Sequence, residues 1–72
     1  MRKTIRQLRE AQGLTQLELA NKLDVTPATV YTWERGRNEP RVSQLRKLAD
    51  LFGVLMDDIE LPEVERAVKI AA

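Results

Sequence analysis

The 72-residue sequence contains no cysteine and no histidine. Without cysteine the chain can form neither a disulfide nor a thiolate metal site, and without histidine it lacks the commonest general base and metal ligand. No apolar run approaches the roughly 20 residues of a membrane span, and the charged N-terminus has no apolar signal core. We therefore expect a soluble intracellular protein that has no membrane segment, no metal or other cofactor, and no enzymatic activity.

A chain of this length forms one domain at most, with a small core that needs close helical packing or a partner subunit. The net charge is only +1, but the charges are unevenly distributed. Residues 1–47 carry ten lysines and arginines against five acids, a net charge of +5, whereas residues 48–72 carry two against six, a net charge of −4. A basic N-terminal part and an acidic C-terminal part predict a surface that binds an anion. The alternative is that the asymmetry arises by chance, as it can in a small domain.

The centre of the sequence predicts two short helices joined by a tight bend. Thr15 and Glu18 have the spacing of a capping box, in which each side chain satisfies a backbone N–H near the other. Thr26 begins the second helix, and Pro27 follows at the first helical position, where a missing N–H costs nothing. Gly36 ends this helix in the left-handed conformation. Helices this short need a surrounding core.

Three further segments repeat apolar residues at helical spacing, and no strand pattern alternates between them. The expected helices of these segments are residues 4–12, 42–52 and 55–59. The sequence therefore predicts an all-α domain of five helices over residues 1–60, with an extension over residues 61–72. Residues 63–72 have the pattern of one more short helix, which either docks on the domain, pairs with a second subunit, or frays.

Val30 and Trp33 fall at i and i+3, so they share one face of the central helix. Helical spacing usually indicates packing, so we expect Trp33 in the core; stacking on a nucleic-acid base is the alternative.

A set of residues at fixed offsets extends from about residue 5 to residue 59. Its members are Thr15-Gln16, Glu18-Leu19-Ala20, Leu23, Val25, Val30, Trp33-Glu34, Gly36, Pro40, Leu48-Ala49, Phe52-Gly53-Val54 and Ile59. This set resembles the helix-turn-helix domain of the lambda-repressor and Cro family of phage and bacterial transcription regulators. The resemblance implies a five-helix lambda-repressor-like fold. Its second helix, about residues 16–23, would cross the DNA backbone, and its third, about residues 27–35, would lie in the major groove.

The same resemblance implies which residues contact double-stranded DNA. Gln16 matches a residue that contacts a phosphate or a base edge from the start of the second helix. The outward positions of the third helix, which face the bases, are Pro27, Ala28, Tyr31 and Thr32. The positions of the following loop, which grips the phosphate backbone, are Arg35, Arg37, Asn38 and Arg41. A plain exposed helix followed by solvated arginines is the alternative for these two groups.

Two further points concern this particular sequence. Arg9 and Glu34 match a pair that bridges the first and third helices in similar proteins. Positions 27, 28 and 32 offer no glutamine, asparagine or arginine for a bidentate base contact. Two alternatives follow: base specificity is modest, or it depends on Gln16, Tyr31 and Arg35 and on DNA shape.

The leading functional prediction is a sequence-specific DNA-binding transcription regulator, a repressor or autoregulator, that acts as a homodimer on a two-fold site. We expect it in the cytoplasm, associated with the nucleoid. The alternative is an antitoxin-like protein-interaction module that binds a protein partner through residues 61–72. The contact face of that module would be Leu61, Val64, Val68 and Ala71.

Overall fold

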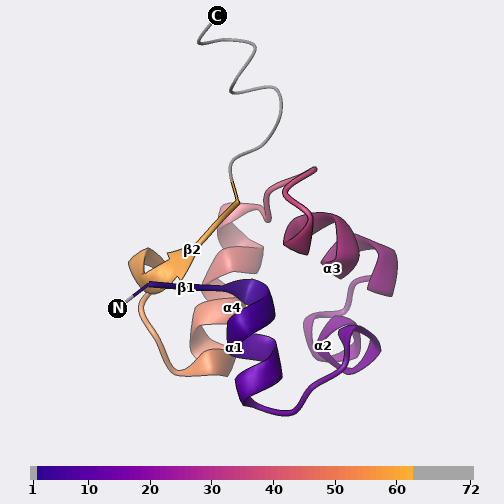
Figure 1. Cartoon of the computed structure of the whole chain (residues 1–72), viewed down its shortest axis with the longest axis horizontal. Coiled ribbons are helices and arrows are strands. Elements are labelled where there is room, and N and C mark those ends of the chain that lie inside the picture. The colour runs from indigo at the N-terminus through magenta and orange to yellow at the C-terminus, as the bar shows by residue number, and fades with distance from the viewer. Residues whose placement is uncertain (1, 63–72) are drawn as a thin grey trace, which may run out of the picture.

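The structure, a computed structural model, describes residues 2–62 and is mostly helical there. Its α-helices are α1 (Ile5–Ala11), α2 (Gln16–Leu23), α3 (Pro27–Glu34) and α4 (Val42–Phe52). A 3-10 turn, η1 (Met56–Asp58), follows α4, and the strands β1 (Lys3–Thr4) and β2 (Ile59–Glu60) pair in parallel. α2 and α3 lie on one side of α1 and α4, whereas η1 and the two strands lie on the other (Figure 1).

The first two helices begin where the sequence predicts. The Gln7 N–H donates to the Thr4 hydroxyl at 3.1 Å, while the Thr4 N–H donates to the Gln7 side chain at 2.9 Å. Thr15 and Glu18 form the same reciprocal pair at 3.0 and 2.8 Å. The predicted capping box of Thr15 and Glu18 is therefore confirmed, Thr4 and Gln7 form a second one, and each satisfies donors that the first helical turn leaves without partners.

A residue in the left-handed conformation follows each helix within two residues of its end. These residues are Gly13, Asp24, Gly36 and Gly53, with φ between 59° and 74°. After α3, for example, the Arg37 N–H donates to the Thr32 carbonyl at 3.0 Å, which closes the helix end. The predicted stop at Gly36 is confirmed.

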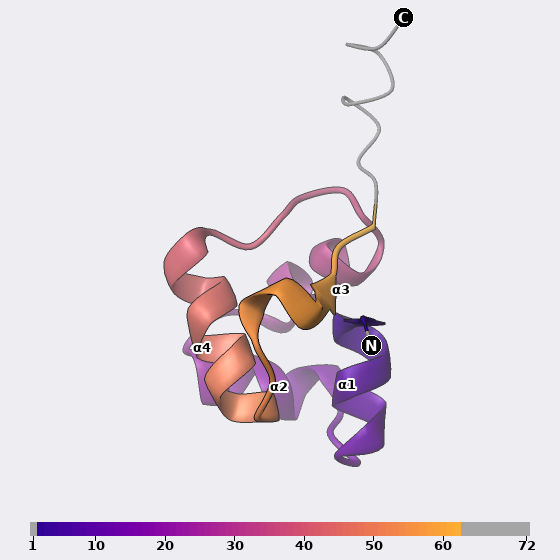
Figure 2. The same cartoon turned by 90° about the vertical axis from the view of Figure 1, so that its left-hand side faces the viewer.

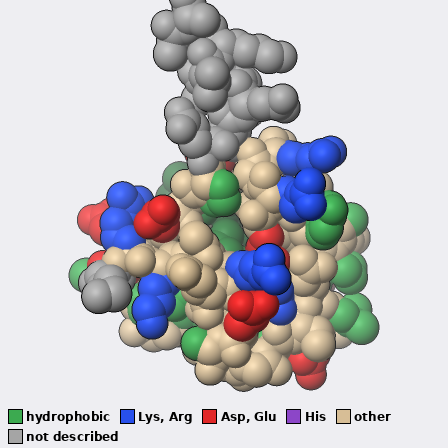
Figure 3. All heavy atoms as spheres, in the orientation of Figure 1, with side chains coloured by type: hydrophobic (Ala, Val, Ile, Leu, Met, Phe, Trp, Pro, Cys, Tyr) green, Lys and Arg blue, Asp and Glu red, His purple; other side chains and the backbone are tan. Residues whose placement is uncertain are grey.

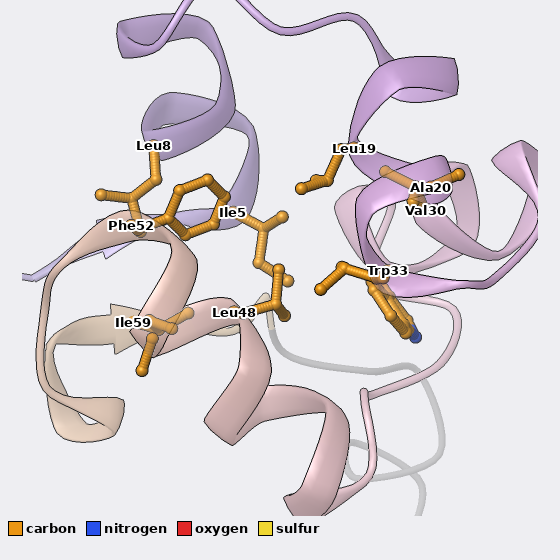
Figure 4. Close-up of a cluster of buried hydrophobic side chains, with 11 residues drawn as sticks. Ile5, Leu8, Leu19, Ala20, Val30, Trp33, Leu48, Phe52 and Ile59 are labelled. Carbon is orange, nitrogen blue, oxygen red and sulfur yellow. The ribbon is translucent and has the colours of Figure 1, made fainter.

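One apolar core joins all four helices and β2 (Figure 4). Its buried members are Ile5, Leu8, Leu19, Ala20, Leu23, Val30, Trp33, Leu48, Ala49, Phe52 and Ile59. Leu19 from α2, Val30 from α3 and Leu48 from α4 have no exposed surface, so the three helices meet there. Trp33 is 3% exposed, which confirms its predicted place in the core. α3 is thus held by its inner face, and its outer face stays available.

The predicted helix over residues 55–59 is only the short 3-10 turn η1, and the count of five helices is not confirmed, because residues 2–62 contain four α-helices. η1 is one turn, closed by a hydrogen bond from the Asp58 N–H to the Leu55 carbonyl at 2.9 Å. Ile59 is extended, with φ −91° and ψ 115°, and pairs with Lys3 in the parallel register. Its apolar spacing reflected burial, since it is 2% exposed, and not a helical backbone.

α4 begins at Val42 without a capping side chain. Arg41 takes the capping position, and its backbone N–H donates to the Gln44 side chain at 2.8 Å. Within residues 2–62 no helix combines the length and the apolar run that a membrane crossing requires. The helix predicted for residues 63–72 lies outside the described residues.

Candidate nucleic-acid interface

The bend between α2 and α3 is built from local hydrogen bonds. Asp24 ends α2 with φ 59°, a conformation that aspartate tolerates better than most side chains do. Thr26 then caps α3, because its hydroxyl accepts the Thr29 N–H at 3.2 Å, and Pro27 occupies the first helical position. The bend sets the orientation of α3 against α2.

A polar network fixes the other end of α3. Arg9 on α1 donates from Nε to Glu34 Oε2 at 2.7 Å and from Nη2 to Oε1 at 3.2 Å. Arg9 Nη1 also donates to the Leu14 carbonyl at 2.7 Å, and Gln16 Nε2 donates to Glu34 Oε1 at 3.0 Å. The Arg9 and Glu34 side chains are only 11% and 5% exposed. The hydrogen bonds to Glu34 raise the pKa of Arg9 above its already high ordinary value. The predicted pair is confirmed, and it ties α1, α2 and α3 together.

The outer face of α3 carries the residues predicted to face bases. Pro27, Ala28 and Tyr31 are exposed, Tyr31 to 45% of its surface. Thr32 is half-buried, and its hydroxyl donates to the Thr29 carbonyl at 2.8 Å. Thr32 is therefore less accessible than the other three.

Tyr31 and Arg35 form a stacked pair at the C-terminal end of this face. The Arg35 guanidinium carbon lies 5.5 Å from the centre of the Tyr31 ring, within the range of a cation–π interaction. The pair borders a polar cavity of about 250 Å³ between α1, α2 and α3. Its lining residues are Arg6, Arg9, Gln16, Tyr31, Glu34 and Arg35. The structure thus brings Gln16, Tyr31 and Arg35, predicted from separate segments, to one place.

Arg6 was not predicted as part of this site. It lies one turn before Arg9 on α1, and that i, i+3 spacing was the signal that could have identified it. It is exposed and forms an ion pair with Glu10 at 3.2 Å.

The loop after α3 exposes its positive charges. It arches from α3 to α4 (Figure 2), and basic side chains gather over the end of α3 and the loop after it (Figure 3). Its exposed predicted residues are Arg35, Arg37, Asn38 and Arg41. Gly36 and Pro40 are buried, so they anchor the backbone that carries these side chains.

Other predictions about the site have different outcomes. Gln16 is half-buried, and one of the two N–H donors of its side-chain amide already binds Glu34 within the protein. Leu61, predicted as part of a partner contact, packs against the core. The remaining members of that face, Val64, Val68 and Ala71, lie outside the described residues. Among residues 2–62, no three acidic residues are grouped in a way that could hold a metal ion.

Known proteins resemble this chain over most of its length. The family profile described as helix-turn-helix matches residues 5–59. An uncharacterized HTH-type transcriptional regulator of Methanocaldococcus jannaschii is 35% identical over 88% of this chain and 96% of its own. The HTH-type transcriptional activator BcrR of Enterococcus faecalis is 33% identical over 76% of this chain and 27% of its own. The cryptic phage CTXphi transcriptional repressor RstR of Vibrio cholerae is 38% identical over 69% of this chain and 45% of its own.

The matched region contains the capped pair α2 and α3, the core that holds α3 by Val30 and Trp33, and the arginine loop. With its geometry and its relatives in agreement, the chain belongs to the helix-turn-helix family of the lambda-repressor and Cro type.

Proposed function

We propose that this chain is a DNA-binding transcription regulator that inserts α3 into the major groove while α2 crosses the backbone. One observation carries the proposal. α3 buries Val30 and Trp33, exposes Pro27, Ala28 and Tyr31, and continues directly into a loop of exposed arginines. A groove-sized surface beside a cationic rim fits a DNA duplex, whose bases are flanked by phosphates.

The arginine loop supplies the phosphate contacts in this proposal. Arg37 and Arg41 are exposed, and each follows a buried residue, Gly36 or Pro40, that fixes the backbone beside it, so their charges are available without refolding of the loop. Asn38 adds hydrogen-bonding capacity to either kind of contact. Gln16 contributes from the start of α2, where the bond to Glu34 aligns its side chain.

We further propose that the protein acts as a repressor or an autoregulator. A domain that covers the major groove can exclude other proteins from the same DNA. The Vibrio cholerae relative is named as a repressor. The Enterococcus faecalis relative is named as an activator, but the match covers only 27% of that protein, so its activating role is not carried over.

In this proposal the protein binds a two-fold DNA site as a homodimer, because one domain of this size covers too little DNA for tight binding. Two heads on half-sites about 34 Å apart bind far more tightly than one. The best candidate contact surface surrounds Leu55, which is 71% exposed. It borders a hollow of about 430 Å³ whose charged residues are Arg46, Asp50 and Asp57. Both signs of charge on one apolar surface suit a two-fold contact, in which the same patch meets itself.

The test is a salt series with Arg37→Ala. Affinity should fall about equally on several duplexes, and the slope of log K against log salt should flatten by about one unit for each lost phosphate contact. The matched control is Lys47→Ala, which removes an exposed positive charge from α4, outside the proposed interface. An unchanged slope for Arg37→Ala would remove this arginine from the phosphate contacts, and absence of duplex binding at low salt would overturn the whole proposal.

Deletion of residues 63–72 tests the alternative role of a protein-interaction module. If the shortened chain loses both the dimer and DNA affinity, the extension serves dimerisation. Intact DNA binding together with loss of a protein partner would favour the interaction module.

A further inference from the structure

Two of the three threonine hydroxyl protons at α3 are already donated within the protein. The hydroxyls of Thr26 and Thr29 lie 2.9 Å apart, and one of them donates to the other. The Thr32 hydroxyl donates its proton to the Thr29 carbonyl at 2.8 Å. Pro27 and Ala28 have no polar side-chain atom. Over its first six residues α3 therefore presents mainly methyl and methylene groups outward, apart from the Tyr31 hydroxyl and the one hydroxyl proton that the Thr26–Thr29 bond leaves free.

The strongest remaining hydrogen-bond donor, the guanidinium of Arg35, lies at the C-terminal end of α3. The Arg35 guanidinium is held 5.5 Å from the Tyr31 ring centre, just after the last residue of α3. It can reach a guanine edge or a phosphate at that end of the site, but it cannot read the base pairs beneath the N-terminal half of the helix.

The major groove presents one apolar group that marks a base, the 5-methyl group of thymine. We propose that the N-terminal half of α3 recognises its DNA site chiefly through thymine methyl groups, which pack against Pro27, Ala28 and the Thr32 methyl. This inference rests on the proposed function, because it specifies which base feature the same surface reads. It also predicts that 5-methylcytosine, which carries a methyl at the same place in the groove, substitutes for thymine in part.

The experiment uses the full chain and a duplex recovered by selection from random sequence. Each thymine of the half-site is replaced in turn by deoxyuracil, which removes only the methyl group. We expect affinity to fall roughly fourfold at each contacted thymine, the effect of one buried methyl-sized group. At the same positions, a duplex with 5-methylcytosine should bind roughly fourfold more tightly than one with cytosine.

A variant locates the contact on the protein. Ala28→Gly should weaken binding to the thymine duplex and leave binding to the matching uracil duplex unchanged, because the two lost methyl groups belong to one contact. The control is Ala11→Gly, the same substitution at an exposed position at the end of α1, which should weaken neither duplex. Circular dichroism verifies that both variants fold.

The outcomes separate this inference from the proposed function. Equal affinity for thymine and uracil duplexes, with salt-dependent binding retained, would overturn methyl recognition and leave DNA binding standing. A uracil effect that persists undiminished in Ala28→Gly and Pro27→Gly would equally reject the assigned contact. Absence of binding to any duplex at low salt would overturn both proposals.

Discussion

The pair formed by Arg9 and Glu34 allows a quantitative test of how α3 is held. We consider Arg9→Met, Glu34→Leu and the double variant, which keep side-chain bulk and remove charge. After Arg9→Met, the Glu34 carboxylate, 5% exposed, retains only the hydrogen bond from Gln16. An ion left without its partner in such a place costs about 3 kcal/mol. Glu34→Leu leaves Arg9 with the Leu14 carbonyl and somewhat more solvent, so about 2 kcal/mol is expected.

The double variant leaves no buried charge. It loses the bonds to the Leu14 carbonyl and from Gln16, each worth about 1 kcal/mol, for a total near 2 kcal/mol. Independent effects of the two substitutions would total about 5 kcal/mol, so the coupling free energy is about 3 kcal/mol. Against an overall stability of about 4–10 kcal/mol for 72 residues, each change is large.

Urea unfolding measures these free energies, with the fluorescence of Trp33 and the circular dichroism of the helices as independent probes. Trp33 is the only tryptophan and the neighbour of Glu34, so its signal reports on this end of α3. The control is Arg6→Met, which breaks the ion pair of Arg6 with Glu10. Because these two side chains are 67% and 54% exposed, the free energy of unfolding should fall by less than about 0.5 kcal/mol. Additive effects, or a double variant no more stable than the worse single variant, would refute the reasoning.

Three further predictions concern α2 and α3. Hydrogen bonds from the Thr15 backbone and hydroxyl lower the pKa of Glu18, so its contribution to stability is present above its ordinary pKa of 4.5 and is lost as pH falls through the lowered value. Glu18→Gln should therefore reduce the acid dependence of unfolding, measured by thermal melts across pH 2–6, and an unchanged acid dependence would contradict the cap. Tyr31→Phe keeps the ring that supports Arg35 and should therefore retain DNA affinity, whereas Tyr31→Ala removes the ring and should weaken binding by about 1 kcal/mol. Binding titrations measure both affinities, and equal losses would point to the hydroxyl instead. Asp24→Gly should raise the free energy of unfolding by about 0.5–1 kcal/mol, since glycine adopts φ 59° without strain, and a decrease in urea titrations would contradict that origin.

The helices could be predicted because their signals are local. Thr15 with Glu18, Thr26 with Pro27, and Gly36 each act within four residues, and all three took the conformation that their side chains favour. The inward face of α3 could also be predicted from the sequence, because residues at helical spacing lie on the same face.

The end of the domain could not be predicted in this way. A strand two residues long is too short to give an alternating pattern, and the pairing of Lys3 with Ile59 joins positions that are distant in sequence. An apolar residue such as Ile59 reveals burial but not the backbone that achieves it.

The candidate site divides in the same manner. Exposure of Arg37 and Arg41 followed from the turn residues between them, and the Arg9–Glu34 pair followed from the resemblance. The hydrogen bond from Gln16 to Glu34 and the internal bond of the Thr32 hydroxyl depend on side-chain rotamers, which no spacing rule specifies. The DNA contacts of Gln16, Thr32, Arg37 and Arg41 stay predictions.

The pairing of β1 with β2 also bears on synthesis. A chain leaves the ribosome from its N-terminus, so Lys3 and Thr4 wait for Ile59 and Glu60 before they can pair. Until then the nascent helices can collapse, but the core lacks the side chain of Ile59. The domain therefore closes in one late event, after nearly all of the described residues have left the exit tunnel.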